Sequence, residues 1–244
     1  MDNKTLIDQN QSTWESFWKK NPTGFDSIMK QATLYFAKTL NKKYPIQPDD
    51  HILDLGCGPG FLIDYLKDKC ELIHGIDISE KYIEICKEQY KDQKNLSISV
   101  NNSYDHDGYN QIIVEKKINK VIMLSVLQYY KDLDEVRNLI LYLKKVSGQQ
   151  SFRCILADII PENNSVIADL KSIIKNSVGK GHTIDFIKFL FYVFFSDYRN
   201  TKKNGMLHIN ESFFTNLGQE LDLKVQIVKN LTVHSGRYSV IIDY

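Results

Sequence analysis

A short apolar segment, residues 51–55, runs directly into a loop that carries three glycines, Gly56, Gly58 and Gly60. Glycine has no Cβ, so such a loop can adopt positive φ angles and lets its main chain approach a ligand closely. A helical pattern opens at Phe61, and the first N–H groups of a helix have no partner within the helix. The strand, loop and helix together predict a ligand-binding element at the carboxyl end of the first strand.

Short apolar runs alternate with helical patterns along most of the chain. Continuous apolar strands that are each followed by a helix indicate a parallel sheet with helices on both faces. We therefore expect a doubly wound α/β fold with a mostly parallel, seven-stranded sheet. The expected strands are 51–55, 72–76, 96–100, 120–124, 152–160, 223–228 and 238–242, and the expected helices include 61–69, 79–90 and 133–146.

We expect one domain of 244 residues with helical additions around its core. Its expected parts are an N-terminal helical cap (1–47), a cofactor-binding core (49–160), a helical insertion or lid (161–221) and the last two strands (222–244). Within the insertion, residues 184–195 form a strongly aromatic helical pattern. This helix is either part of the core or a lid that lines an apolar pocket.

The composition restricts the partners. Lys and Arg number 31 against 30 Asp and Glu, the formal net charge is +1, and arginine occurs only at four positions. This balance argues against a nucleic-acid partner.

The sequence shows no apolar leader, no bilayer-spanning apolar run and no paired spacing of its four cysteines. We expect a cytoplasmic protein without stable membrane insertion, and its oligomeric state stays open.

Asp77 lies 21 residues after Gly56, at the end of the next expected strand. That spacing suits a carboxylate that accepts hydrogen bonds from ribose hydroxyls. A dinucleotide fingerprint would place its third glycine at position 61, which is Phe, and no arginine follows Asp77 to hold a 2′-phosphate. An NAD-linked oxidoreductase is therefore the weaker interpretation.

Three segments resemble motifs of the class I S-adenosylmethionine (SAM)-dependent methyltransferases, a family with a Rossmann-like fold. Residues 52–60, Ile-Leu-Asp-Leu-Gly-Cys-Gly-Pro-Gly, are similar to the family's first motif, and residues 75–79, Gly-Ile-Asp-Ile-Ser, to its second at matching spacing. Residues 119–129 resemble the fourth-strand motif, although Asn119 and Gln128 stand where the family usually has Asp and His.

The resemblance implies SAM as the cofactor and S-adenosylhomocysteine as the product. In the family the glycines pass beneath the methionine part of the cofactor, the residue at Asp54 organises its amino end, and that at Asp77 binds the ribose. Asn102 stands where an acidic residue usually contacts the adenine amine. The cofactor positions implied in this sequence are Asp54, Gly56, Cys57, Gly58, Gly60, Asp77, Ile78, Asn102, Ser103 and Ser125.

Methyl transfer from a sulfonium is an in-line displacement, so the protein mainly aligns the reacting groups and excludes water. An alcohol acceptor would also need a base, and histidine suits that task near neutral pH. The catalytic candidates are His208, His182 and Tyr129, and the substrate-binding candidates are Gln128, Tyr129, Tyr130 and His208. Residues 105–107, Asp-His-Asp, are interpreted as a polar loop, and no cluster with metal-ligand spacing is present, so we expect no metal.

These features favour a methyltransferase that modifies a small apolar or aromatic molecule, preferentially at oxygen, with the substrate free or bound to a carrier protein. A protein or RNA methyltransferase and a non-catalytic SAM-binding protein are the alternatives. Against RNA stand the near-neutral charge, the few arginines and the lack of an Asn-Pro-Pro-Tyr-type tetrapeptide after the fourth strand.

Overall fold

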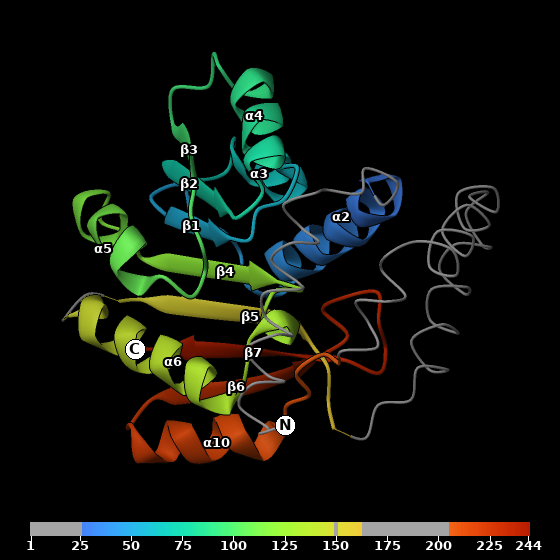
Figure 1. Cartoon of the computed structure of the whole chain (residues 1–244), viewed down its shortest axis with the longest axis vertical. Coiled ribbons are helices and arrows are strands. Elements are labelled where there is room, and N and C mark those ends of the chain that lie inside the picture. Colours follow the sequence, from blue (N-terminus) through green and yellow to red (C-terminus); the bar gives the residue numbers. More distant parts are fainter. Residues whose placement is uncertain (1–25, 149–150, 163–204) are drawn as a thin grey trace, which may run out of the picture.

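A seven-stranded sheet forms the centre of the computed structural model, which describes residues 26–148, 151–162 and 205–244 (Figure 1). The strand order is β3-β2-β1-β4-β5-β7-β6. The strands are β1 (His51–Leu55), β2 (Leu72–Asp77), β3 (Leu96–Val100), β4 (Lys120–Leu124), β5 (Arg153–Ile159), β6 (Lys224–Lys229) and β7 (Tyr238–Asp243). The first five strands pair in parallel, and β7 is antiparallel to both β5 and β6. The expected doubly wound, seven-stranded fold is confirmed.

Helices cover both faces of this sheet. They are α2 (Asp26–Lys43), α3 (Phe61–Leu66), α4 (Glu80–Gln89), α5 (His106–Glu115), α6 (Leu133–Ser147) and α10 (Glu211–Glu220), with a 3₁₀ turn, η2 (Leu127–Tyr129). Buried side chains of α2, α3 and α4 share one core cluster, whereas those of α5, α6 and α10 share the other. Successive residues of β4 alternate between the two clusters, which explains why the central strands are apolar at nearly every position.

The strand order reverses between β1 and β4. From β1 the chain proceeds through β2 to β3 on one side, and from β4 it proceeds to β5 on the other. In open parallel sheets the crevice at such a switch point, beyond the carboxyl ends of the strands, is where ligands bind. The loops that follow β1, β2, β4 and β5 are therefore the ones that build the site.

One local expectation is wrong. The 105–107 segment, interpreted from sequence as a polar loop, forms the start of α5: the Asp105 side chain caps this helix by accepting a hydrogen bond from the Gly108 amide. The sequence pattern did not indicate this helix because it buries only Tyr109 and Ile113. After β4 the chain forms η2, and α6 begins behind the cap residue Asp132.

The predictions for residues 1–25 and for the aromatic 184–195 segment lie outside the described residues. Of the expected cap the structure describes α2, and of the expected insertion it describes α10 and the segment that leads into it. No helix within the ranges that the structure describes is long and apolar enough to cross a bilayer.

A buried ion pair joins the start of β4 to the residue that precedes β1. The Lys120 ammonium donates to Asp50 Oδ2, and the two side chains are only 9% and 7% exposed. Lys120→Met would leave the Asp50 carboxylate buried without its charge partner, so we expect a loss of about 3–5 kcal/mol in the free energy of unfolding, measured by urea denaturation.

Lys91→Met is the matched control, because Lys91 pairs with Glu88 on the surface and is 62% exposed. The loss of this surface ion pair should lower the free energy of unfolding by less than about 1 kcal/mol. Equal effects of the two substitutions would contradict the role assigned to the buried pair.

Candidate functional site

The three glycines of the loop after β1 all adopt the left-handed conformation, with φ of 82° at Gly56, 52° at Gly58 and 80° at Gly60. The amides of Gly56 and Cys57 both donate to the carbonyl of Ile76, at 2.8 and 2.9 Å, which fastens the loop to the end of β2. A Cβ on Gly56 would lie 2.4 Å from Val126 Cγ2, so the loop packs directly against the segment after β4. The loop therefore joins the two halves of the switch point.

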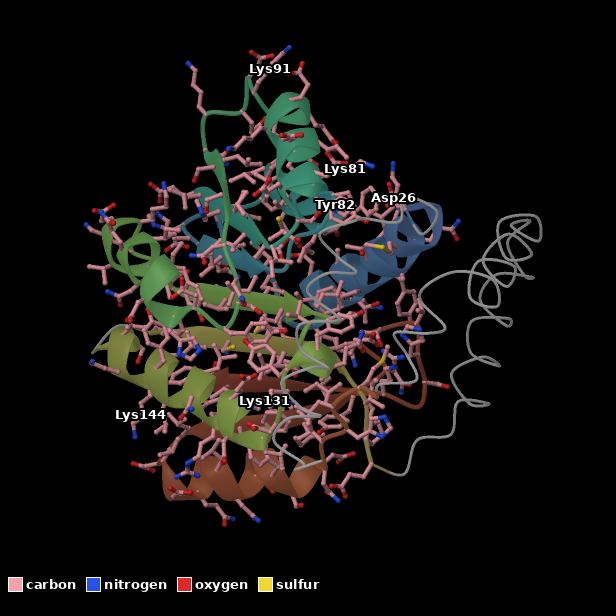
Figure 2. All side chains as sticks on the ribbon, viewed as in Figure 1. Asp26, Lys81, Tyr82, Lys91, Lys131 and Lys144 are labelled. Atoms are coloured by element: carbon pink, nitrogen blue, oxygen red, sulfur yellow. The ribbon has the colours of Figure 1, made fainter. Side chains whose placement is uncertain are left out.

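Gly58 faces a different environment. A Cβ built on it would lie 3.7 Å from the Cε of Met29 and would meet nothing else in the described part of the chain, which leaves room above the main chain there. Met29 belongs to α2, whose first residue, Asp26, accepts a hydrogen bond from the Tyr82 hydroxyl of α4 at 3.2 Å (Figure 2). Helix α2 thus lies over the glycine loop and is anchored to α4.

Asp77, at the end of β2, holds the glycine loop in place. Its Oδ2 accepts the Gly58 amide and its Oδ1 the Ser79 amide, both at 2.8 Å. Burial raises the pKa of Asp77, and these two main-chain hydrogen bonds act in the opposite direction. A carboxylate has about four acceptor positions, so Asp77 keeps capacity for a ligand while it fixes the loop.

Asp54, on β1, is a buried carboxylate with an orphaned oxygen. Its side chain is 2% exposed, and Oδ2 has no hydrogen-bond partner within the described part of the chain. Burial, and after it the negative charge of Asp77, raises the pKa of Asp54 to about 8. An unpaired buried acceptor is costly in a native protein, so this oxygen indicates a ligand that brings a donor, best a cationic one.

The loop after β3 is tied to η2 on the other side of the switch point. Tyr104 donates its hydroxyl to the Tyr129 carbonyl at 2.9 Å, and Tyr130 donates its hydroxyl to the Ser103 carbonyl at 3.1 Å. The amide oxygen of Asn102 accepts the Tyr104 main-chain amide at 2.8 Å, so in this state it caps its own loop. Tyr130 is 3% exposed and packs in the core, whereas Tyr129 is half-buried.

A second buried carboxylate, Asp158, lies near the carboxyl end of β5, where the sequence analysis assigned no function. Its Oδ2 accepts hydrogen bonds from Ser125 Oγ and Arg237 Nη1, both at 2.8 Å. Its Oδ1 accepts hydrogen bonds from Thr232 Oγ1 at 2.9 Å and His234 Nδ1 at 2.8 Å. Burial alone would raise the pKa of Asp158, but the charges of Arg237 and His234 and the hydrogen bonds from His234 and Ser125 hold it well below its usual range.

This network includes one of the predicted substrate residues. Arg237 Nη1 also donates to Gln128 Oε1 at 3.0 Å, and Gln128 is 8% exposed. The carbonyl of Gln128 accepts the Leu207 amide at 2.9 Å, which brings the segment before α10 to the same edge of the sheet. His208, the next residue, carries an exposed side chain there.

The structure thus gathers most of the predicted positions at the carboxyl edge of the sheet. Asp54, the glycine loop and Asp77 lie together at the ends of β1 and β2, and Ser125 and Gln128 belong to the Asp158 network. Cys57 is buried in the loop, with its Sγ 3.7 Å from the Gly58 carbonyl oxygen. His182 lies outside the described residues. In the ranges that are described, no group of three His, Cys, Asp or Glu side chains could hold a metal ion.

The sequence offered one signal for Asp158, because this charged residue interrupts an apolar run near the carboxyl end of an expected strand. His234 and Arg237 offered none. They belong to the turn between β6 and β7, and only the placement of β7 beside β5 brings that turn to the site.

A glycine loop between the first strand and its helix, with carboxylates at the ends of β1 and β2, defines a Rossmann-like protein that binds a nucleoside cofactor at the switch point. Comparison with known proteins narrows this class. Residues 52–146 match a family described as a methyltransferase domain.

The curated relatives that match the chain are also described as methyltransferases. An uncharacterised methyltransferase of Schizosaccharomyces pombe is 28% identical over 113 residues, which are 45% of this chain and 38% of the relative. Ribosomal RNA small subunit methyltransferase A of Malacoplasma penetrans is 25% identical over 134 residues, 51% of this chain and 49% of the relative. The chain therefore spans about two fifths to one half of the length of these curated relatives.

Among solved structures, magnesium protoporphyrin IX methyltransferase of Synechocystis PCC 6803 with bound S-adenosylhomocysteine shares the fold. Its TM-score is 0.52 at 17% identity, over 88% of this chain and 81% of that one. The match over residues 52–146 and the shared fold agree with the class that the motifs predicted, the class I SAM-dependent methyltransferases. Their cofactor fits the residues present, because its ammonium group would supply the donor that Asp54 Oδ2 lacks and its ribose hydroxyls would reach the acceptor positions left on Asp77.

The raised pKa of Asp54 predicts proton-linked cofactor binding. Below about pH 8 the free chain holds a proton on Asp54, whereas a cationic amino group favours the ionised carboxylate, so binding must release that proton. The affinity for S-adenosylhomocysteine, measured by calorimetry, should decrease as the pH falls from about 7.5 to about 5.5, and the decrease should approach about tenfold per pH unit. Asp54→Asn should bind more weakly and with a flatter pH profile. A pH-independent affinity of the natural chain would contradict the assignment.

The same shift predicts a stability effect of the opposite sign. The folded chain holds the Asp54 proton more tightly than the unfolded chain, so this carboxyl costs folding free energy increasingly as the pH rises from its ordinary pKa of 3.8 toward about 8. Without ligand, Asp54→Asn should melt higher than the natural chain at pH 8, by roughly 2–4 °C for each kcal/mol regained, and about equally near pH 4. A lower melting temperature at pH 8 would show that the carboxylate is satisfied.

Two glycine substitutions separate cofactor contact from packing. Gly58→Ala places its methyl group in the space below Met29, so we expect about a tenfold or greater loss of affinity for S-adenosylhomocysteine with a modest stability cost. Gly60→Ala places its methyl group 2.9 Å from Cys86 Sγ and from Tyr90 Cε2, so its main effect should be a loss of about 1–3 kcal/mol in stability. Calorimetry and urea denaturation of both variants check this contrast, and the reverse pattern would contradict it.

Proposed function

We propose that the chain transfers the methyl group of SAM to a small apolar or aromatic molecule, with oxygen as the favoured acceptor atom and the acceptor free or bound to a carrier protein. The single observation that carries the cofactor part is the orphaned, buried oxygen of Asp54 beside the loop held by Asp77. Within residues 26–148, 151–162 and 205–244 this oxygen has no hydrogen-bond donor, and the cofactor would bring one.

When bound, the cofactor supplies an activated methyl group. Asp54 and Asp77 would hold its two ends, which fixes the direction in which the methyl group faces. Main-chain contact at Gly58 and the cover provided by Met29 of α2 would exclude water from that side. Because displacement at a sulfonium needs little help with bond chemistry, this alignment accounts for most of the work, about 7–11 kcal/mol in well-oriented systems.

The proposal of a small-molecule acceptor rests on the charge of the chain and on a structural relative that has such an acceptor. A formal net charge of +1 and four arginines provide little attraction for a polyanion, and Arg153 and Arg237 are engaged with Asp243 and Asp158. The magnesium protoporphyrin IX methyltransferase, whose name states a small-molecule acceptor, is similar over most of both chains. These observations support a small molecule over a macromolecule.

RNA is the second candidate, because a matching relative is a ribosomal RNA methyltransferase. That match is 25% identical and covers about half of each chain, 51% of this one and 49% of the relative. A chain that binds the cofactor without turnover is the third possibility, and a turnover assay distinguishes it from both.

The first test is calorimetry with S-adenosylhomocysteine. We expect saturable binding by the natural chain and a loss of about 10–100-fold in Asp77→Ala, because the ribose hydroxyls lose a charged acceptor. Asp92→Ala, at an exposed carboxylate, is the control and should bind normally. Absent binding, or equal binding by the Asp77 and Asp92 variants, would defeat the assignment.

The second test measures S-adenosylhomocysteine release from SAM with three kinds of acceptor: phenols, aromatic carboxylic acids and a short RNA hairpin. Turnover with a phenol or a carboxylic acid is the expected result. Turnover with RNA alone would replace the proposed acceptor, and cofactor binding without release on any of them would indicate the non-catalytic protein.

A further inference from the structure

The polar network around Asp158 is built on strained main chain. Ser125, which follows β4, and Asp158, near the end of β5, both have positive φ, 59° and 68°, although neither is glycine. The pairing of β5 with β7 shifts register between Leu156 and Ile159, so Asp158 lies in an irregularity of the strand. Such irregularities redirect a side chain, and main-chain strain of this kind is typically kept at functional sites.

The hydrogen bonds of Asp158 determine which nitrogen of the neutral His234 ring carries a hydrogen. Two donors reach each oxygen of Asp158, which fills the roughly four acceptor positions of a carboxylate. The Arg237 guanidinium contacts one of these oxygens, so the carboxyl is ionised and can only accept. His234 Nδ1 must therefore carry a hydrogen, and in the neutral ring the free lone pair lies on Nε2.

His234 lies at the carboxyl edge of the sheet, the edge that also carries Asp54 and Asp77. It belongs to the loop between β6 and β7, and the pairing of Ile159 with Tyr238 sets the end of this loop beside the carboxyl end of β5. Through Asp158 the ring is connected to Ser125, which follows β4 at the switch point. The side chain is 17% exposed, and nothing in the described ranges bonds to its Nε2.

His74 shows the contrasting case of a structural histidine. Both of its ring nitrogens are engaged, with Ser97 Oγ at 2.6 Å and Ser99 Oγ at 2.9 Å, and the residue is 4% exposed. His234 instead has one nitrogen fixed by a carboxylate, and its other nitrogen has no partner among the residues that the structure describes. This is the arrangement of a base whose orientation is set by a third group.

We propose that His234, oriented by Asp158, is the base that removes the proton from the hydroxyl of the methyl acceptor. The proposal rests on the proposed function. Nε2 accepts the hydroxyl proton while that oxygen forms its bond to the methyl carbon, and the electron pair of the broken carbon–sulfur bond stays on sulfur. Asp158 compensates the charge of the imidazolium, which returns its proton to water. The acceptor class is thereby a hydroxyl compound that is neutral at working pH.

The test uses His234→Asn in the full chain. The asparagine amide can occupy the place of Nδ1 and still donate to Asp158, but it has no group in the place of Nε2. Two probes are compared at mildly alkaline pH: phenol, which is neutral there, and 4-nitrophenol, which is largely ionised. We expect turnover of phenol to fall by about 10²–10⁴-fold and turnover of 4-nitrophenol by only a few-fold, with unchanged affinity for S-adenosylhomocysteine.

His51→Asn is the matched control. His51 also engages an oxygen through Nδ1, the Lys116 carbonyl, but it lies at the opposite, amino edge of the sheet. It should leave both turnover rates unchanged.

Each other outcome overturns the proposal in a recognisable way. An equal loss on both probes would show that His234 only supports the structure, and no loss would show that it is not the base. Loss of phenol turnover in His208→Asn but not in His234→Asn would assign proton removal to His208. If the natural chain binds S-adenosylhomocysteine but methylates neither probe, the proposed acceptor class fails, and the base falls with it.

Discussion

The hydrogen bond from the Gly58 amide to the Asp77 carboxylate is the interaction on which the site depends. It joins the loop after β1 to the end of β2 and holds glycine main chain in a conformation that other residues adopt at a cost. It also places a second negative charge near Asp54, whose pKa is raised first by burial and then by that charge. As far as the structure describes the chain, the site is preformed and Asp54 Oδ2 has no donor, which on our account a cationic cofactor supplies.

Two buried carboxylates at the switch point of the sheet, Asp54 and Asp158, have contrasting surroundings. Among the described residues Asp54 finds no partner for one oxygen, and its pKa is raised, whereas Asp158 has donors on both oxygens and a lowered pKa. Surroundings that raise the pKa of one carboxyl group and lower that of another are typical of sites in which the two groups have different roles. On our account Asp54 belongs to the cofactor half and Asp158 to the acceptor half, and the contact of Gly56 with Val126 links them.

The sequence was sufficient for the sheet and for the cofactor side, and insufficient for the acceptor side. Strands buried on both faces are apolar along their whole length, so residues 51–55 and 120–124 were predicted with their observed limits. The cofactor carboxylates lie at short spacings from the glycines in the sequence, so the local sequence pattern was enough to predict them. The contact of Asp158 with His234 spans 76 residues and requires β7 to enter the sheet beside β5, which no local pattern reveals. Helix α5 was missed for a different reason, since only Tyr109 and Ile113 of it are buried.

The most direct measurement is a crystal structure of the chain with S-adenosylhomocysteine. The account predicts the amino group of the ligand within hydrogen-bond distance of Asp54 Oδ2, its ribose hydroxyls on Asp77 and its chain against the main chain at Gly58. A ligand bound elsewhere, or an Asp54 oxygen that stays without a partner in the complex, would contradict it.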